Sequence, residues 1–112
     1  MLHPEIFSTK RLIRAFKKEV EIVLYLDLHG HSHQKNIFVY GNNHEDQPHL
    51  TRVFPYLMSK ICDYFSFESS RFFVHKSKEQ TARVSMWREL GIPNVFTMEA
   101  SFCGADIGEL AG

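Results

Sequence analysis

The sequence predicts an α/β fold, with a partial mixed β-sheet flanked by helices. Stretches with helical spacing of apolar residues alternate with short strand-like runs, and the first helical stretch is followed directly by a buried strand. The chain has 112 residues, of which 44% are apolar, so it can bury one modest core. These features predict a single domain over residues 1–112.

The first two predicted elements are a helix and a strand. Ser8 and Thr9 stand where a helix cap belongs, immediately before a predicted helix over residues 10–19. The stretch "EIVLYLDLHG", residues 21–30, is predicted to be a strand. It is apolar on both faces as far as Asp27, which is typical of a central strand covered on two sides.

The later elements alternate in the same manner. Strands are predicted over residues 36–41, 71–75 and 92–102, and helices over residues 50–65 and 76–91. The first of these helices must hold Pro55 in its first turn, whereas the second begins as a polar loop and ends at Gly91. In that second helix Met86, Trp87 and Leu90 are predicted to be core residues.

Composition argues against several classes of protein. The 13 Lys and Arg residues balance the 13 Asp and Glu residues, so net charge indicates neither nucleic acid nor a membrane surface as a partner. No run approaches the roughly 20 apolar residues of a membrane helix, and residues 1–20 do not resemble a signal peptide. Cys62 and Cys103 form no closely spaced pair, as expected of a reduced cytoplasmic chain.

Histidines gather where the strand over residues 21–30 ends. In "LDLHGHSHQKN" an apolar run reaches Asp27, and His29, His31 and His33 then follow at alternate positions. Asp27 and His29 point to the same face of a strand, and the carboxyl ends of strands are where α/β sheets bind ligands. The pattern therefore favours a metal ligand, although a polar loop histidine is an ordinary alternative for each of them.

A glutamate lies within the apolar strand over residues 92–102. Glu99 shares a face with Val95, Thr97 and Ser101, and its burial is costly unless the carboxylate is paired, solvated or used. One interpretation is a salt bridge to a neighbouring arginine. The other is a general base that works in a cleft.

Three stretches together resemble a known family. "YLDLHGHSHQKNIFVYG", "KSKEQTARVSMWRELGI" and "FTMEASFCGADIGELAG" are similar, in order, to successive motifs of the cytosolic carboxypeptidases, and "HPEIFSTKRLI" resembles the segment before them. These are zinc metallocarboxypeptidases that remove glutamates from tubulin tails and other acidic protein ends. The resemblance covers the later half of their catalytic domain, and it implies the corresponding half of that fold.

The resemblance also implies roles for individual residues. His29 matches a zinc ligand, and Glu99 matches the catalytic glutamate. Arg83 falls close to the site that reads the side chain of the departing residue, where a guanidinium could hold a glutamate carboxylate. Lys76 and Lys78 are expected to add positive charge for an acidic tail, with solvated loop lysines as the alternative.

Part of the family pattern is absent from this sequence. Zinc in this class is held by two histidines and a glutamate, two of them from a His-x-x-Glu motif, and no such motif occurs here. The family's arginine and asparagine that hold the peptide carboxylate are also missing. We therefore expect residues 1–112 to be a partial catalytic domain, inactive alone, in which His31 and His33 support the site without binding zinc.

Two alternatives remain open. The first is a non-catalytic remnant that binds acidic tails, such as polyglutamylated tubulin, through Arg83 and the two lysines. The second is an amidohydrolase or related phosphoesterase, whose barrel needs about 250 residues and so does not fit this length. The carboxypeptidase interpretation predicts a cytoplasmic hydrolase that can associate with the cytoskeleton and has no nucleic-acid or membrane partner.

Overall fold

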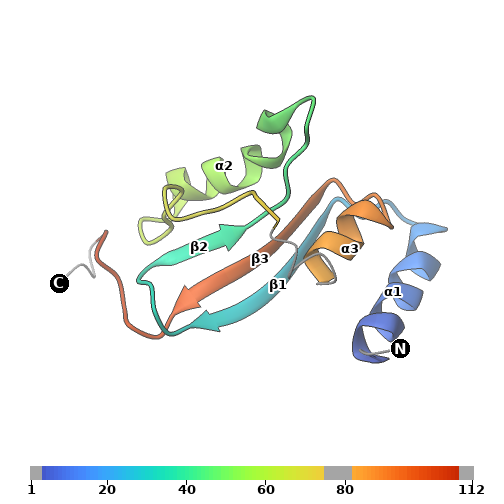
Figure 1. Ribbon diagram of the computed structural model, residues 1–112, viewed down its shortest axis with the longest axis horizontal. Coiled ribbons are helices and arrows are strands. Elements are labelled where there is room, and N and C mark those ends of the chain that lie inside the picture. The colour runs from blue at the N-terminus through green and yellow to red at the C-terminus, as the bar shows by residue number, and fades with distance from the viewer. Residues whose placement is uncertain (1–3, 75–81, 109–112) are drawn as a thin grey trace.

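The computed structural model describes residues 4–74 and 82–108, and it confirms the α/β class (Figure 1). In this part of the chain the helices are α1 (Pro4–Lys17), α2 (Val53–Ile61) and α3 (Ala82–Arg88), with a 3₁₀ turn, η1 (Pro48–Thr51), before α2. The strands are β1 (Leu24–His31), β2 (Ile37–Tyr40) and β3 (Asn94–Ser101). They form one mixed sheet.

The strand order is β1-β3-β2, so β3 is the central strand. β1 runs parallel to β3, and β2 runs antiparallel to it. The prediction that residues 21–30 form a central strand is therefore wrong for the described residues, since β1 lies at an edge and Leu28 is 72% exposed. Apolar residues on both faces of β1 indicate surface suited to burial, but they do not say which element covers it.

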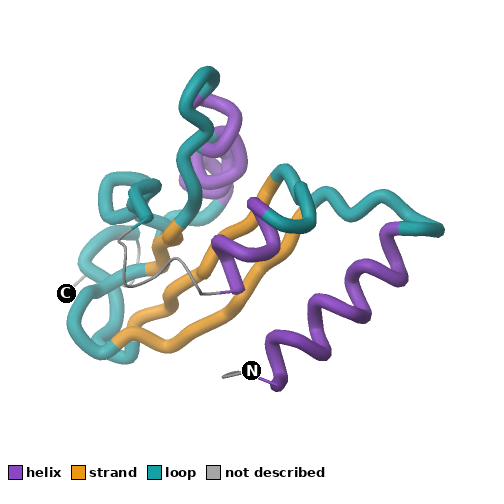
Figure 2. The backbone as a smooth tube through the Cα atoms, turned by 45° about the vertical axis from the view of Figure 1, so that its right-hand side comes forward, coloured by secondary structure: helices purple, strands orange, loops and turns teal. Residues whose placement is uncertain are grey.

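The two faces of the sheet carry separate apolar clusters, with α2 over one face and α3 over the other (Figure 2). On the α2 side, Phe96 of β3 packs with Val39, Phe65 and Phe72, and its ring stacks on Phe54 at 5.2 Å. On the α3 side the cluster lies at the beginnings of β1 and β3. Its buried members are Met86, Leu90, Ile92 and Val95, with Ile13, Ile22, Tyr25 and Trp87 packed against them.

Helix α1 begins earlier than the sequence suggested. It starts at Pro4, where a residue with fixed φ and no N–H suits the first turn, so Ser8 and Thr9 are helical residues and do not cap it. The Thr9 hydroxyl instead donates to the Glu5 carbonyl, 2.8 Å away. Among the described residues no helix is long and apolar enough to cross a membrane.

The later boundaries agree with the predictions in part. Pro55 does lie in the first turn of α2, and Gly91 ends the α3 segment with a left-handed φ of 63°. Residues 71–74 do not form the predicted strand. Arg71 makes only an isolated bridge to Tyr40, and its N–H and carbonyl bond to Val39 and Gly41 respectively.

The attachment of α1 to α3 should weaken in acid. Lys10 donates to Glu89 at 2.8 Å, and this hydrogen bond, with the charges of Lys10 and Arg14, holds the pKa of Glu89 below its ordinary value of 4.5 despite slight burial. A lowered folded-state pKa stabilises the contact above pH 4.5, and this stabilisation is lost as pH falls through the lower, folded value. When the pH falls through that value, the hydrogen-exchange rates of the α1 amides, corrected for intrinsic rates, should rise more than those of the β3 amides. In Glu89→Gln this extra acceleration should disappear; if it persists, Glu89 is not its cause.

Candidate functional site

The site predicted from the sequence begins with one row of the sheet. His29 of β1 and Glu99 of β3 are direct partners in the parallel register, and Phe38 of β2 pairs with Glu99 on the other side. Neighbouring strands lie about 4.8 Å apart, and partner residues point to the same face. The structure thus places the imidazole and the carboxylate side by side on the α3 face of the sheet, beyond the cluster that α3 covers.

Asp27 sets the orientation of the His29 ring. The Nε2 atom of His29 lies 3.0 Å from Oδ2 of Asp27, which is two residues earlier in β1 and on the same face of the sheet. A carboxylate accepts the Nε2–H hydrogen, so the lone pair of a neutral His29 ring lies on Nδ1. The His29 side chain is 48% exposed, and no hydrogen bond to its Nδ1 atom occurs among the described residues.

Glu99 is buried without a charged partner in the described residues. It is 8% exposed, and within residues 4–74 and 82–108 its carboxylate has neither a hydrogen-bond nor an ion-pair partner. The alternative interpretation, a salt bridge to a neighbouring arginine, is thus not what this part of the structure shows. A buried, unpaired carboxylate is costly, so this position favours a group that is used.

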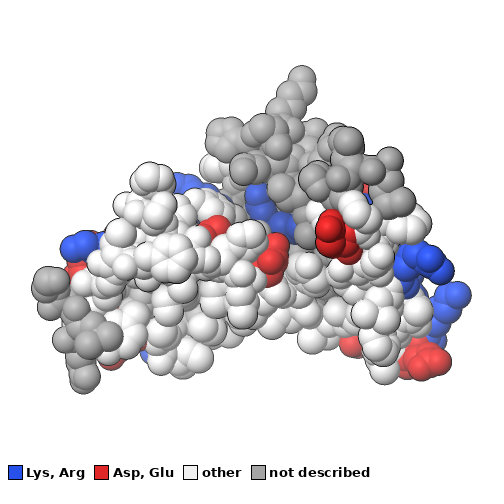
Figure 3. All heavy atoms as spheres, turned by 90° about the horizontal axis from the view of Figure 1, so that it is seen from below, with Lys and Arg blue, Asp and Glu red and all other residues white. Residues whose placement is uncertain are grey.

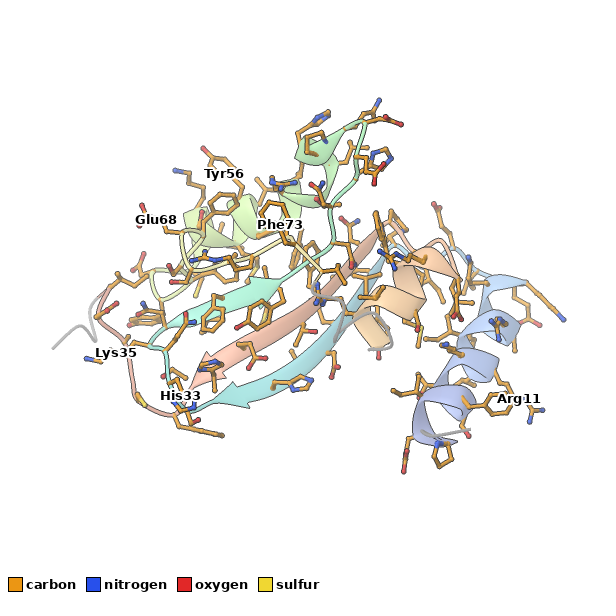
Figure 4. The ribbon with its side chains drawn as sticks, viewed as in Figure 1. Arg11, His33, Lys35, Tyr56, Glu68 and Phe73 are labelled. Atoms are coloured by element: carbon orange, nitrogen blue, oxygen red, sulfur yellow. The ribbon has the colours of Figure 1, made fainter. Side chains whose placement is uncertain are left out.

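His31 and His33 occupy a different environment. The Nδ1 atom of His31 accepts the backbone N–H groups of His33 and Gln34 at 3.1 and 3.0 Å, and its ring meets Phe38 edge-on at 5.3 Å. His33 lies beside the tips of β1 and β3 (Figure 4). These contacts shape the loop after β1, and the expectation that the two residues support the site stays a prediction.

Asn36 ties that loop to the segment after β3. Its backbone is left-handed, with φ of 72°, and its N–H donates to the Gly104 carbonyl at 2.9 Å. Its side chain exchanges two hydrogen bonds with Asp106, at 2.6 and 2.9 Å. The chain after His29 and the chain after Glu99 are thereby held together.

Arg83 lies on α3, over the same face of the sheet. It is 6% exposed, and its Nη1 atom donates to the Gly41 carbonyl just after β2. Burial lowers the pKa of Arg83 below its ordinary value, while the electrostatic interaction with Tyr40 acts in the opposite direction. No carboxylate pairs with this guanidinium among the described residues.

The register relates Arg83 to Glu99. Tyr40, the neighbour of Arg83, pairs with Thr97, and Glu99 is two residues further along β3. Two residues of strand span about 6.6 Å, a separation comparable with the reach of a glutamate side chain. On the face drawn in Figure 3, acidic and basic side chains lie near one another about the middle and also gather at the ends of the molecule. A buried cation and a buried anion therefore lie on the same face of the sheet, with Arg83 bonded to the Gly41 carbonyl, three residues beyond Phe38, the partner of Glu99.

The described residues do not make a complete metal site. No group of three His, Cys, Asp or Glu side chains in residues 4–74 and 82–108 could hold a metal ion. His29, oriented by Asp27, fits the requirements of a single ligand, and two more would have to come from elsewhere. The predicted tail-binding lysines, Lys76 and Lys78, lie outside the described residues.

Sequence reasoning overlooked two residues that shape this face. Tyr40 and Asn42 follow the alternation of β2; Asn42 bonds to the Arg83 carbonyl, and Tyr40 interacts electrostatically with the guanidinium. The sequence "VYGN" contained a signal for these contacts. A glycine between two residues with polar groups indicates that another part of the protein comes close to the backbone there. Only the register showed which side chain they meet.

Comparison with known proteins gives the family. The chain is 46% identical over 114 residues to cytosolic carboxypeptidase 3 of Bos taurus and 46% identical over 113 residues to cytosolic carboxypeptidase 2 of Danio rerio, each alignment covering 97% of this chain. It is 38% identical over 128 residues to cytosolic carboxypeptidase 1 of Mus musculus, with 99% covered. The chain belongs to the cytosolic carboxypeptidase family.

This carboxypeptidase segment matches a small part of its relatives. The alignments cover 11% of the Bos taurus protein, 16% of the Danio rerio protein and 10% of the Mus musculus protein. No family model matches the chain. The aligned segment contains His29, Arg83 and Glu99, so the site of this carboxypeptidase segment can be tested within the framework of a longer relative.

The Asp27–His29 contact makes a prediction about the tautomer of this segment. At about pH 8 the neutral ring of His29 should carry its hydrogen on Nε2, because Asp27 accepts it there. In Asp27→Ala this preference should weaken, as measured by long-range ¹H–¹⁵N correlation spectra of the ring. His31 is a matched control, since its Nδ1 accepts two backbone N–H groups and should keep the same tautomer in both proteins. If the His29 spectrum is unchanged in Asp27→Ala, the Asp27 carboxylate does not determine the tautomer of the His29 ring.

Proposed function

We propose that this chain is part of the catalytic domain of a zinc metallocarboxypeptidase that removes C-terminal glutamates from acidic protein tails. The observation that carries this proposal is the in-register pair of His29 and Glu99 on one face of the sheet. The relatives' name, cytosolic carboxypeptidase, supports the peptidase class and a cytoplasmic location. Tails of polyglutamylated tubulin are the substrates we propose, with an association with the cytoskeleton as a consequence.

The proposed chemistry uses two groups of this chain at the reacting centre. His29 would supply one metal ligand through Nδ1, and a zinc ion, when bound, supplies Lewis acidity to a water and to the scissile carbonyl. Glu99 accepts a proton from the attacking water at its carboxylate and delivers it to the leaving amine. The remaining ligands and the groups that hold the terminal carboxylate would come from outside this chain, so residues 1–112 alone should not hydrolyse peptides.

Arg83 supplies the proposed preference for glutamate. Its guanidinium is buried on the same face of the sheet as Glu99 and has no carboxylate partner among the described residues. A substrate carboxylate in that position would provide the missing counter-charge, and charge-assisted hydrogen bonds to arginine are strong and directional. A neutral side chain would instead leave the guanidinium unpaired.

The role of Glu99 can be measured in a chimera. In cytosolic carboxypeptidase 3 of Bos taurus, the 114-residue segment that this chain matches would be replaced by the chain itself. In that chimera Glu99→Gln should lower kcat by about 10²- to 10⁴-fold, because a general base is lost while the shape of the side chain is kept. Bound zinc, measured by mass spectrometry, should not change.

Glu68→Gln is the matched control for this substitution. Glu68 is exposed and lies in the chain that covers the α2 side of the sheet (Figure 4), so the same change of charge should leave kcat as it was. A Glu99→Gln chimera that keeps full activity would contradict the proposed role. So would a chimera that binds acidic tails without turnover, which is the result expected of a non-catalytic remnant.

The role of Arg83 predicts a change of specificity. In the same chimera Arg83→Ala should lower kcat/KM for peptides ending in glutamate about 10- to 100-fold more than for peptides ending in a neutral residue, as expected for one or two charged hydrogen bonds. Arg71→Ala is the control, because Arg71 is exposed and, among the described residues, its guanidinium bonds only to the backbone carbonyls of Glu68 and Ser70. If kcat/KM falls equally for both kinds of peptide, Arg83 does not recognise the C-terminal side chain.

A further inference from the structure

The two residues after β2 contact Arg83 in two different ways. The Gly41 carbonyl accepts a hydrogen bond from the guanidinium, and the Asn42 side chain donates one to the Arg83 backbone carbonyl. The side chain and the main chain of Arg83 are thus held by adjacent residues. An arginine that only filled space would need neither contact.

Gly41 can accept this bond because it has no side chain. A Cβ atom at this position would lie 2.9 Å from the Phe72 ring and 3.0 Å from the Phe96 ring, closer than real Cβ atoms come or at the limit of what they show. The Gly41 N–H donates to the Arg71 carbonyl at 2.8 Å, which fixes the peptide on its other side. The carbonyl that meets Arg83 is therefore held by packing and by a hydrogen bond.

Asn42 connects α3 to the central strand. Its Nδ2 atom lies 3.4 Å from the carbonyl oxygens of both Arg83 and Val95, and the residue is 1% exposed. Its Oδ1 atom is buried and has no hydrogen-bond partner. An unpaired buried acceptor is unfavourable, so an apolar side chain of similar shape would be the more stable choice here. The amide is then explained by the two bonds that it donates.

We propose that Asn42 is a positioning residue for Arg83: it joins the first turn of α3 to β3, so that the guanidinium stays on the Gly41 carbonyl and is presented to an acidic C-terminal side chain. The part of this proposal that concerns recognition of glutamate rests on the proposed function. The part that concerns the position of the Arg83 guanidinium rests on the contacts alone. The two parts therefore have separate readouts.

The first readout is hydrogen exchange of the Arg83 guanidinium, measured by NMR on the full 112-residue chain with ¹⁵N-labelled arginine. Asn42→Leu removes the donor and the unpaired acceptor together, so the melting temperature should be maintained or raised. Exchange of the Arg83 guanidinium hydrogens should nevertheless become at least about tenfold faster. Asn42→Ala is the second variant, should leucine not fit. Unchanged exchange in the variant that folds would overturn the proposal.

The second readout is specificity in the chimera described above. Asn42→Leu should raise KM for peptides ending in glutamate about tenfold, with less than a twofold change for neutral peptides, and it should have no further effect when Arg83 is already alanine. If Arg83→Ala lowers cleavage of both peptides equally, the proposed reading of glutamate fails, while the exchange result still decides the positioning. If Arg83→Ala is selective and Asn42→Leu is not, the positioning role is overturned.

Discussion

The parallel register between β1 and β3 is the constraint on which the rest of this structure depends. It sets His29 directly beside Glu99, and the same register brings Asp27 level with Thr97 and Tyr40. A slip of one residue would turn one set of side chains to the α2 face, because successive residues of a strand alternate. The apolar clusters on the two faces oppose such a slip, since Val95 and Phe96 are each buried on their own side.

Charges on the α3 face are distributed in an unusual way for a stable core. Glu99 and Arg83 are both nearly buried, of opposite sign, and not paired with each other in the described structure. Folding alone would favour either a direct ion pair or apolar replacements. The proposed function would account for this arrangement, because its substrate brings a reacting bond and an acidic group to the same face.

The ends of the strands are held by polar contacts rather than by apolar packing. Asn36 and Asp106 join the two segments that follow β1 and β3, while His31 organises the turn through its Nδ1 atom. Lys35 lies in the same turn (Figure 4), whereas Arg11 on α1 lies at the other end of the molecule. The part of the site that would meet substrate is thus stiffened by hydrogen bonds between segments about 70 residues apart in the chain.

The sequence by itself determined the α/β class, the general position of most elements, and the residues with a chemical reason to be special: a histidine at a strand end and a glutamate in an apolar strand. These follow from local periodicity and from the cost of burying charge, which are readable residue by residue. It misjudged the start of α1, the strand at 71–75 and the central place of β1, because helix ends and strand neighbours depend on contacts between distant segments. Only the tertiary structure decided that β3 lies between β1 and β2, that His29 lies beside Glu99, and that Gly41 and Asn42 meet Arg83. These contacts join residues that are far apart in the sequence and depend on strand register and packing. Local sequence patterns therefore cannot predict them.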